Sequence, residues 1–463
     1  MPDRTCNIVL IHSDQHRFDC LGCNGHPLLR TPNLDRLAAE GVNFAMAFTP
    51  SPICSPERAS LLTGLWPIRH GCLSIPNTEL YRPALDGLPT FSQVLRERGY
   101  RLGYVGRFHQ ELRGDPRDYG FDDYLPLGEY NLWRQGQGLP DMPQSNGWFG
   151  QTDPHIHPSQ SRLAWGADRA IETIERYAAV GKPFLVRWDP VEPHLPNVVP
   201  EPYASMYPPQ TIRPWMSFPD SLQGKPYIQR QQRRTWKVDG WPWQRWAPIV
   251  SRYLGEVTLM DEQIGRVLAA IDRLGLCDNT LVVYTTDHGD MCGAHGMMDK
   301  HFIMYDDVVR VPLIARLPGL LPAGGVCDAF VCHALDLAAT FCELAGAPAP
   351  KTFQGRSLLG VAAGADSQPR QDIFSMWHGG QLGSFTQRMV RDRRWKYVWN
   401  ASAEDELYDL QADPAELVNR AADGAVRDEL ARLRRRLAEW MEQVGDFMLN
   451  PWTRAQLLDN TKV

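Results

Sequence analysis

Short runs of apolar residues recur along the chain, and each has the length of a fully buried strand. These runs are Asn7–Ser13, Arg101–Val105, Pro183–Trp188, Leu281–Thr286 and Val311–Ala315. Helical patterns lie between them, and Ser251–Gly275 repeats its apolar residues with a helical spacing that places them on one face. The alternation of strands with helices predicts an α/β fold built on a large, mostly parallel sheet flanked by helices.

The C-terminal part of the chain has a different pattern. A small, polar, loop-like stretch, Ala362–Gln371, interrupts the alternation. After it, Arg388–Trp399 is predicted to form strands of a smaller sheet, and Ala425–Val444 a terminal amphipathic helix. We therefore expect a large domain over residues 1–365 and a smaller C-terminal α+β subdomain over residues 366–463.

Residues 205–246 are crowded with prolines, arginines and tryptophans. Such a stretch is either an irregular surface excursion anchored by its aromatic side chains or a loop that recognises a ligand, and the sequence favours neither. The tryptophans concerned are Trp215, Trp236, Trp241, Trp243 and Trp246.

Composition narrows the possible functions. The chain has 463 residues, is 43% hydrophobic and carries a net charge of −6, so it lacks the basic surplus of a nucleic-acid-binding protein. No apolar stretch reaches the length of a membrane span and the start of the sequence does not form a signal peptide, so we expect a cytoplasmic location. The ten cysteines are then expected to be free thiols, and the C-x-x-C pair Cys20 and Cys23 to be buried structural thiols rather than a redox or zinc site.

One cysteine lies at a predicted helix start. Ser55 is a natural N-cap, Pro56 suits the first helical position and Gly64 suits the C-terminal cap, so Cys54 is expected just before a helix N-terminus. Free backbone N–H groups and the helix dipole at such a place lower a thiol pKa and attract anions. Arg58, one turn into the helix, can reach the same spot. A merely structural buried cysteine fits the local pattern equally well.

Polar clusters follow four of the predicted strands. In a parallel sheet the carboxyl ends of the strands share one edge, where α/β proteins place their ligands, so these clusters are predicted to form one site. The side chains are Asp14 and Gln15 after the first strand, Arg107 and His109 after the second, His194 past the third, and Asp287 and His288 after the fourth.

A metal site is predicted within this group. Asp14, Gln15, Asp287 and His288 offer two carboxylates, an amide oxygen and an imidazole. A ligand set rich in oxygen with a single nitrogen suits Ca²⁺, Mg²⁺ or Mn²⁺ better than zinc. The alternative, that Asp287 and His288 merely cap the next helix, leaves the pairing with Asp14 and Gln15 unexplained.

These motifs together resemble the type I sulfatases of the alkaline phosphatase superfamily, and the resemblance covers nearly the whole chain. The matching segments are the C-x-P-x-R motif Cys54–Arg58, its continuation Leu61–Gly64, the first-helix sequence Thr31–Leu37, the metal segment Asp287–Asp290, the lysine segment Met298–Lys300 with Val311–Ile314, and Glu406–Leu410 in the smaller C-terminal part.

The resemblance implies a chemistry for Cys54. In this family a maturation enzyme oxidises the cysteine to formylglycine, whose hydrate attacks the sulfur of a small anionic sulfate ester. One hydroxyl of the hydrate would carry the sulfuryl group, and the other would let the adduct collapse to the aldehyde and expel sulfate. Residue 54 would also complete the metal site, with Ca²⁺ expected and Mn²⁺ or Mg²⁺ as alternatives.

The resemblance also assigns roles to the basic residues. Arg58, Arg107 and Lys300 would neutralise the sulfate oxygens in the transition state. His109 would lie by the diol as hydrogen-bond partner and base, and His194 would protonate the leaving alcohol or bind a sulfate oxygen. The sequence does not show which histidine has which role.

Three positions depart from the family pattern. Glu57 stands where Ser or Thr is usual, Gln15 replaces a second aspartate, and Arg107 stands where a lysine is usual. The Glu57 change bears on maturation, the Gln15 change leaves the metal one carboxylate fewer, and the arginine at 107 keeps the charge in a longer, planar group.

Two other functions fit parts of the pattern. A phosphonate monoester hydrolase or phosphodiesterase of the same superfamily would share Asp14, Gln15 and Cys54, but such enzymes tend to lack the pair found at Arg107 and His109. A non-catalytic binding protein on the same fold would be expected to have lost a ligand or the nucleophile. For a sulfatase, the substrate could be a carbohydrate, alkyl or aryl sulfate, with the Trp-rich segment and residues 378–381 shaping the leaving-group pocket. A homo-oligomer is also possible.

Overall fold

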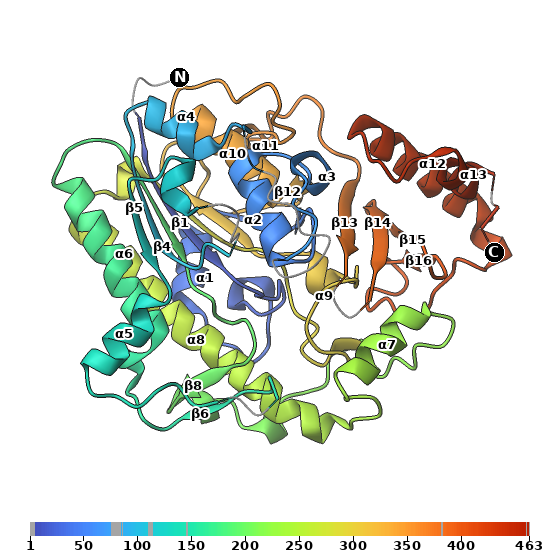
Figure 1. Cartoon of the computed structure of the whole chain (residues 1–463), viewed down its shortest axis with the longest axis horizontal. Helices are drawn as coiled ribbons and strands as arrows, with labels where there is room; N and C mark the ends of the chain where they lie inside the picture. The colour runs from blue at the N-terminus through green and yellow to red at the C-terminus, as the bar shows by residue number, and fades with distance from the viewer. Residues whose placement is uncertain are drawn as a thin grey trace.

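The large sheet organises the protein (Figure 1). The structure is a computed structural model, and it describes residues 5–75, 85, 87–109, 114–144, 147–380, 383–459 and 461–462. Within this part of the chain the sheet has eight strands, all parallel to their neighbours except β10, which runs antiparallel to both. In spatial order they are β11 (Gly325–Cys327), β2 (Val42–Phe44), β10 (Leu313–Arg316), β9 (Thr280–Thr286), β1 (Asn7–Ser13), β7 (Phe184–Asp189), β4 (Arg101–Gly106) and β5 (Asp123–Pro126).

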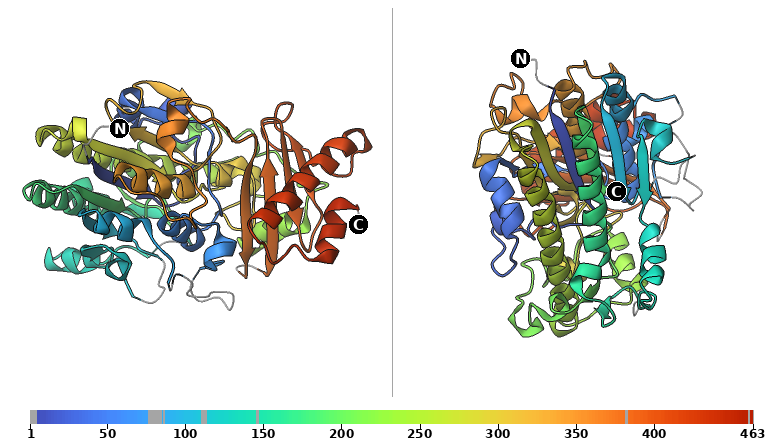
Figure 2. Two further views of the ribbon diagram at one scale, coloured as in Figure 1. Left: turned by 90° about the horizontal axis from the view of Figure 1, so that it is seen from above. Right: turned by 90° about the vertical axis from the view of Figure 1, so that its left-hand side faces the viewer.

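Helices cover both faces of this sheet because its central strands are buried on both sides. In β1, Val9 and Ile11 pack on one face against α1 (Pro32–Glu40), α6 (Arg162–Ala178) and α8 (Trp243–Arg273). The alternate residues Ile8 and Leu10 belong to a second core on the other face, together with α2 (Cys54–Thr63), α4 (Phe91–Glu97) and α10 (His333–Leu344). Figure 2 (right) shows α6 and α8 side by side across the sheet. The predicted α/β class with a mostly parallel sheet is confirmed.

The smaller C-terminal sheet is antiparallel. Its strands are β13 (Ile373–Gly379), β14 (Phe385–Arg391), β15 (Trp395–Asn400) and β16 (Glu406–Asp409). The helices α12 (Arg427–Gln443) and α13 (Pro451–Leu458) lie on its outer side (Figure 2, left). The division at residue 365 falls in the loop after α11 (Leu358–Ala362), and it stays a prediction. Core residues of both parts pack in one cluster.

The remaining elements connect these layers. They are the helices α3 (Pro67–His70), α5 (Glu129–Gly136), α7 (Tyr227–Thr235) and α9 (Asp306–Val309), and the two-stranded sheets β3 (Ala47–Phe48) with β12 (Val331–Cys332) and β6 (Gln151–Asp153) with β8 (Val198–Pro200). None of the described helices is long and apolar enough to cross a membrane. All ten cysteines lie in the described ranges as free thiols, with Cys20 buried and Cys23 partly exposed.

The Trp-rich segment is more regular than an excursion. It contains α7, and α8 begins at Trp243 rather than near Ser251, so Trp243 and Trp246 are helical and buried. The proline at position 248, inside α8, masked this helix start in the sequence because proline is rare in helix interiors.

Candidate active site

The nucleophile candidate opens a helix. α2 begins at Cys54 itself, and Ile53, with an extended backbone, occupies the N-cap position. The expectation that Ser55 caps this helix is wrong: its hydroxyl donates to the backbone carbonyl of His109 at 2.7 Å instead. This bond ties the start of α2 to the loop that follows β4.

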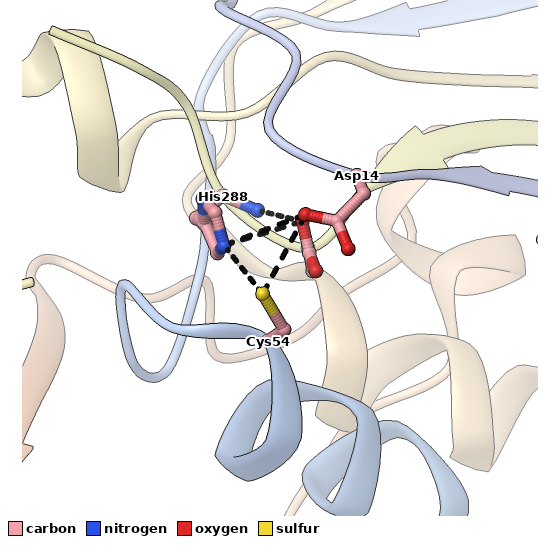
Figure 3. A group of neighbouring side chains, drawn as sticks. Asp14, Cys54 and His288 are labelled. Atoms are coloured by element: carbon pink, nitrogen blue, oxygen red, sulfur yellow. Dashed lines mark hydrogen bonds and ion pairs between the residues drawn. The ribbon is translucent and has the colours of Figure 1, made fainter. Parts of the chain in front are cut away.

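A compact set of metal-ligand groups surrounds Cys54 (Figure 3). Donor atoms of Asp14, Cys54, Asp287 and His288 all lie within 4.8 Å of one another, and all four residues are buried. The Cys54 Sγ is 3.3 Å from His288 Nε2 and 3.5 Å from Asp14 Oδ1. Because His288 Nδ1 bonds to the carbonyl of Gly289 at 2.9 Å, its proton is held there and the Nε2 lone pair faces the cluster. The donor set fits a divalent cation.

Gln15 lies beside this cluster with its side chain fixed at both ends. Its amide nitrogen donates to Asp290 at 2.8 Å and to Asp299 at 3.1 Å. Its Oε1 therefore faces the other way, and accepts from Lys300 Nζ at 2.5 Å. The backbone of Gln15 is in the left-handed region with φ of 69°, a conformation found at functional sites when the surroundings enforce it. Asp290 and Asp299 were not among the predicted site residues.

The Arg58 guanidinium bonds to three buried carboxylates. It donates to Asp14 at 3.2 Å, to Asp287 at 3.0 Å and to Asp189 at 2.5 Å, and none of these side chains is exposed. Arg187 holds Asp189 with two further bonds of 2.7 Å. Sequence reasoning missed Asp189, although it directly follows the predicted third strand and the strand-end rule could have found it.

The buried Glu57 carboxylate lies between two buried histidines. Its two carboxylate oxygens lie 3.3 Å from Nε2 of His12 on β1 and 3.3 Å from Nε2 of His333 on α10. These are ion-pair distances that lack hydrogen-bond alignment. His12 Nδ1 in turn lies 3.4 Å from Asp189. The unusual residue at this position is thus accommodated by two buried histidines, one of them far away in the sequence.

Arg107 and Lys300 each bond to a histidine, and these bonds define the tautomers of the two histidines. Arg107 donates to His109 Nε2 at 2.8 Å and lies 3.4 Å from Asp14, while Lys300 Nζ lies 2.7 Å from His194 Nε2. A guanidinium or ammonium can only donate, so both Nε2 atoms accept and each imidazole carries its proton on Nδ1. The Nδ1 of His194 donates to the adjoining Leu195 carbonyl. The Nδ1 of His109 has no partner among the described residues.

Burial sets the proton affinities in the site. Burial, with the nearby Asp14 carboxylate, raises the pKa of the Cys54 thiol well above its usual value, so the expectation that the helix start lowers it is wrong. A neutral thiol is a poor nucleophile. Burial and the charge of Lys300 lower the pKa of His194 to about 3. Burial would lower the pKa of Lys300, but the carboxylates around it, among them Asp299 and Asp14, raise it.

The site opens into a cavity of about 610 Å³. Its polar lining includes Cys54, Arg107, His109, His194 and Lys300, so the structure brings the predicted catalytic and substrate-binding side chains to one space. Arg58 and the carboxylates lie behind them, fully buried.

The 378–381 stretch does not contribute to this lining as far as the structure describes it. His378 instead pairs with the Thr386 hydroxyl at 2.9 Å and packs against Phe447. Gln381 lies outside the described residues.

Comparison with known proteins identifies the class. The sulfatase family model matches residues 6–347, and the model for the C-terminal part of N-sulphoglucosamine sulphohydrolase matches residues 293–443. The chain is 29% identical to the uncharacterized sulfatase YidJ of Escherichia coli over 97% of this chain and 90% of that protein. It is also 29% identical to an arylsulfatase of Clostridium perfringens over 94% of each. The chain belongs to the sulfatase family, and it is a sulfuric ester hydrolase.

A solved structure places the fold in the same superfamily. The phosphonate monoester hydrolase of Agrobacterium radiobacter superposes with a TM-score of 0.82 at 25% identity, over 98% of this chain and 96% of that one. The alkaline phosphatase-like fold is thereby confirmed, and the similarity keeps the phosphonate alternative open to test.

Proposed function

We propose that the protein hydrolyses sulfate monoesters with a formylglycine made from Cys54 and a divalent cation, with Ca²⁺ the first candidate. The observation that carries this proposal is the position of Cys54, at the start of α2 and within 3.5 Å of both Asp14 and His288, at the floor of a cavity lined by basic side chains. Asp14, Gln15, Asp287, His288 and residue 54 would hold the cation.

The divalent cation and the formylglycine would each supply one part of the chemistry. The bound cation would act as a Lewis acid toward a sulfate oxygen, and hydrated formylglycine would offer one hydroxyl to accept the sulfuryl group and a second to release it. An unmodified Cys54 would do neither well, because burial keeps its thiol neutral.

The protein's own side chains supply positive charge at fixed positions. Lys300 and Arg107 line the cavity and would bind sulfate oxygens, while Arg58 orients Asp14 and Asp287 from behind. Gln15 fixes the position of the Lys300 ammonium, and His109 and Asp14 fix that of the Arg107 guanidinium. Little reorganisation of these side chains is therefore needed as charge develops in the transition state.

The histidines differ in what they can donate. His109 has an Nδ1 proton that no described residue accepts, and it would donate this proton in a hydrogen bond to the nucleophile. The Nδ1 proton of His194 is held by the backbone, and its Nε2 accepts a hydrogen bond from Lys300. The His194–Lys300 pair would therefore deliver the proton to the leaving alcohol.

The phosphonate monoester hydrolase activity remains the second candidate, because an enzyme with that activity shares the fold. Arg107 and His109, paired at 2.8 Å in the cavity, favour the sulfatase. Measuring kcat/KM for 4-nitrophenyl sulfate and for 4-nitrophenyl phenylphosphonate decides between them. A clear preference for the phosphonate would reject the sulfatase proposal.

A further inference from the structure

A group of aromatic side chains lines the same cavity as the nucleophile. Trp148 and Phe149 come from the loop before β6, and Trp236 and Trp241 from the turn between α7 and α8. These segments lie far apart in the sequence, so the fold has gathered four rings beside Cys54.

Three of the four rings, those of Phe149, Trp236 and Trp241, support one another. Phe149 packs against Trp241 with centroids 5.0 Å apart and against Trp236 at 6.4 Å. Trp241 also packs on the buried Trp246 at 5.5 Å, and the Arg245 guanidinium covers it at 3.9 Å. This part of the cavity wall is therefore preorganised, which lowers the ordering cost of binding a ligand.

The ring of Trp148 is exposed, and the backbone that carries it is strained. Trp148 is 53% exposed and its backbone has φ of 74°, a strained conformation for a bulky residue. A tryptophan that served only to anchor the fold would be buried, as Trp246 is. Strain together with exposure in a cavity wall is typical of a binding surface.

Beside the rings the lining carries one charged side chain, the exposed Lys237, and it holds few acidic groups. Asp299 is its only described carboxylate, and it is already engaged by His301 at 2.7 Å and by Gln15 at 3.1 Å. The basic residues Arg107 and Lys300 adjoin the nucleophile. A ligand here would place its sulfate on the basic groups and an uncharged, flat surface on the rings.

We propose that these four rings form a leaving-group subsite that selects sulfate esters of a ring-bearing alcohol, either a sugar or an aryl alcohol, over open-chain alkyl sulfates. The inference rests on the proposed sulfatase function and adds the substrate class. The shared chemistry is a six-membered ring that presents an apolar face to tryptophan. The two tryptophans of residues 205–246 that line the cavity thus have a recognition role, whereas Trp243 and Trp246 anchor the fold.

The test uses three esters and three variants of the full-length, formylglycine-containing enzyme. N-acetylglucosamine 6-sulfate and ethyl sulfate are both esters of primary alcohols, so they differ mainly in the ring, and 4-nitrophenyl sulfate supplies the aryl ring. Sulfate release gives kcat/KM for each. Trp148→Ala removes the ring at an exposed position, and Trp148→Phe keeps a ring there. Trp452→Ala is the matched control, because it removes a tryptophan that is 77% exposed on α13.

Trp148→Ala is expected to lower kcat/KM for a ring ester about tenfold more than for ethyl sulfate, the size of one aromatic stacking contact. Trp148→Phe should recover most of that difference, and Trp452→Ala should show none. A loss confined to the sugar or to the aryl ester identifies the source of the ring. An equal loss for all three esters overturns the subsite, as does a parent enzyme that prefers ethyl sulfate to N-acetylglucosamine 6-sulfate. A parent that cleaves none of them, while cleaving the phosphonate ester, rejects the sulfatase proposal itself.

Discussion

Replacing Lys300 with methionine removes one positive charge from the cavity and keeps a side chain of similar length. Nζ of Lys300 bonds to Gln15 at 2.5 Å and to His194 at 2.7 Å, and the side chain is 5% exposed. A preordered charged donor in such a buried site stabilises a developing anion by about 2–4 kcal/mol, which corresponds to a loss of about 30- to 1,000-fold in kcat/KM.

The assay is the initial rate of 4-nitrophenyl sulfate hydrolysis over a range of concentrations, so that kcat and KM are separated. The larger part of the loss should fall on kcat, because the contact strengthens as charge develops. Lys182→Met is the matched control. Lys182 is exposed and lies just before the amino end of β7, whereas the site lies at the carboxyl ends of the strands.

Thermal stability and the size of the rate loss together decide whether Lys300 binds sulfate. Removing Lys300 leaves the buried Gln15 Oε1 and His194 Nε2 without the bonds that Lys300 donates, which costs about 1–3 kcal/mol of stability per atom, so thermal unfolding must be followed alongside the rates. A folded Lys300→Met enzyme that loses less than about threefold in kcat/KM, under 1 kcal/mol, would refute the assignment of Lys300 to sulfate binding.

Further changes test other parts of the site and fold. Asp14→Asn or Asp287→Asn should abolish both turnover and bound metal, measured by elemental analysis, and full activity after chelator treatment would show that the metal site is misplaced. Cys54→Ser should accept one sulfuryl group and stall, giving a stoichiometric burst of alcohol, because it lacks the second hydroxyl; steady turnover would contradict the diol route. Burial, with Glu192 nearby, raises the pKa of Glu256 to about 8, so its contribution to stability is complete below its ordinary pKa and is lost as pH rises toward 8. Glu256→Gln should therefore reduce the fall in Tm between pH 5 and pH 8, and an unchanged slope would contradict it.

The strand-end rule accounts for what the sequence could predict. Asp14 and Asp287 follow the adjacent, parallel strands β1 and β9. Their meeting follows from the parallel sheet that the alternation of strands and helices predicts. The same rule reaches Asp189 at the end of β7, which the sequence reasoning passed over. Local pattern was sufficient here because neighbouring parallel strands fix where their ends lie.

Other features depend on packing that no local pattern encodes. The pairing of Glu57 with His333 joins α2 to α10, and the Trp148 wall joins a loop to the turn after α7. The Cys54 pKa was mispredicted for a related reason: the helix start is local and visible in sequence, whereas burial and the Asp14 charge are tertiary.

The central claim is that residue 54 acts as formylglycine in a sulfatase. The most direct measurement is the formylglycine fraction of the peptide spanning residues 51–58, determined by mass spectrometry in preparations made with and without a co-expressed maturation enzyme, and set against specific activity on 4-nitrophenyl sulfate. Activity should rise in proportion to that fraction and extrapolate to zero at none, even if Glu57 lowers conversion. Undiminished sulfatase turnover in a preparation that contains only unmodified Cys54 would contradict the account.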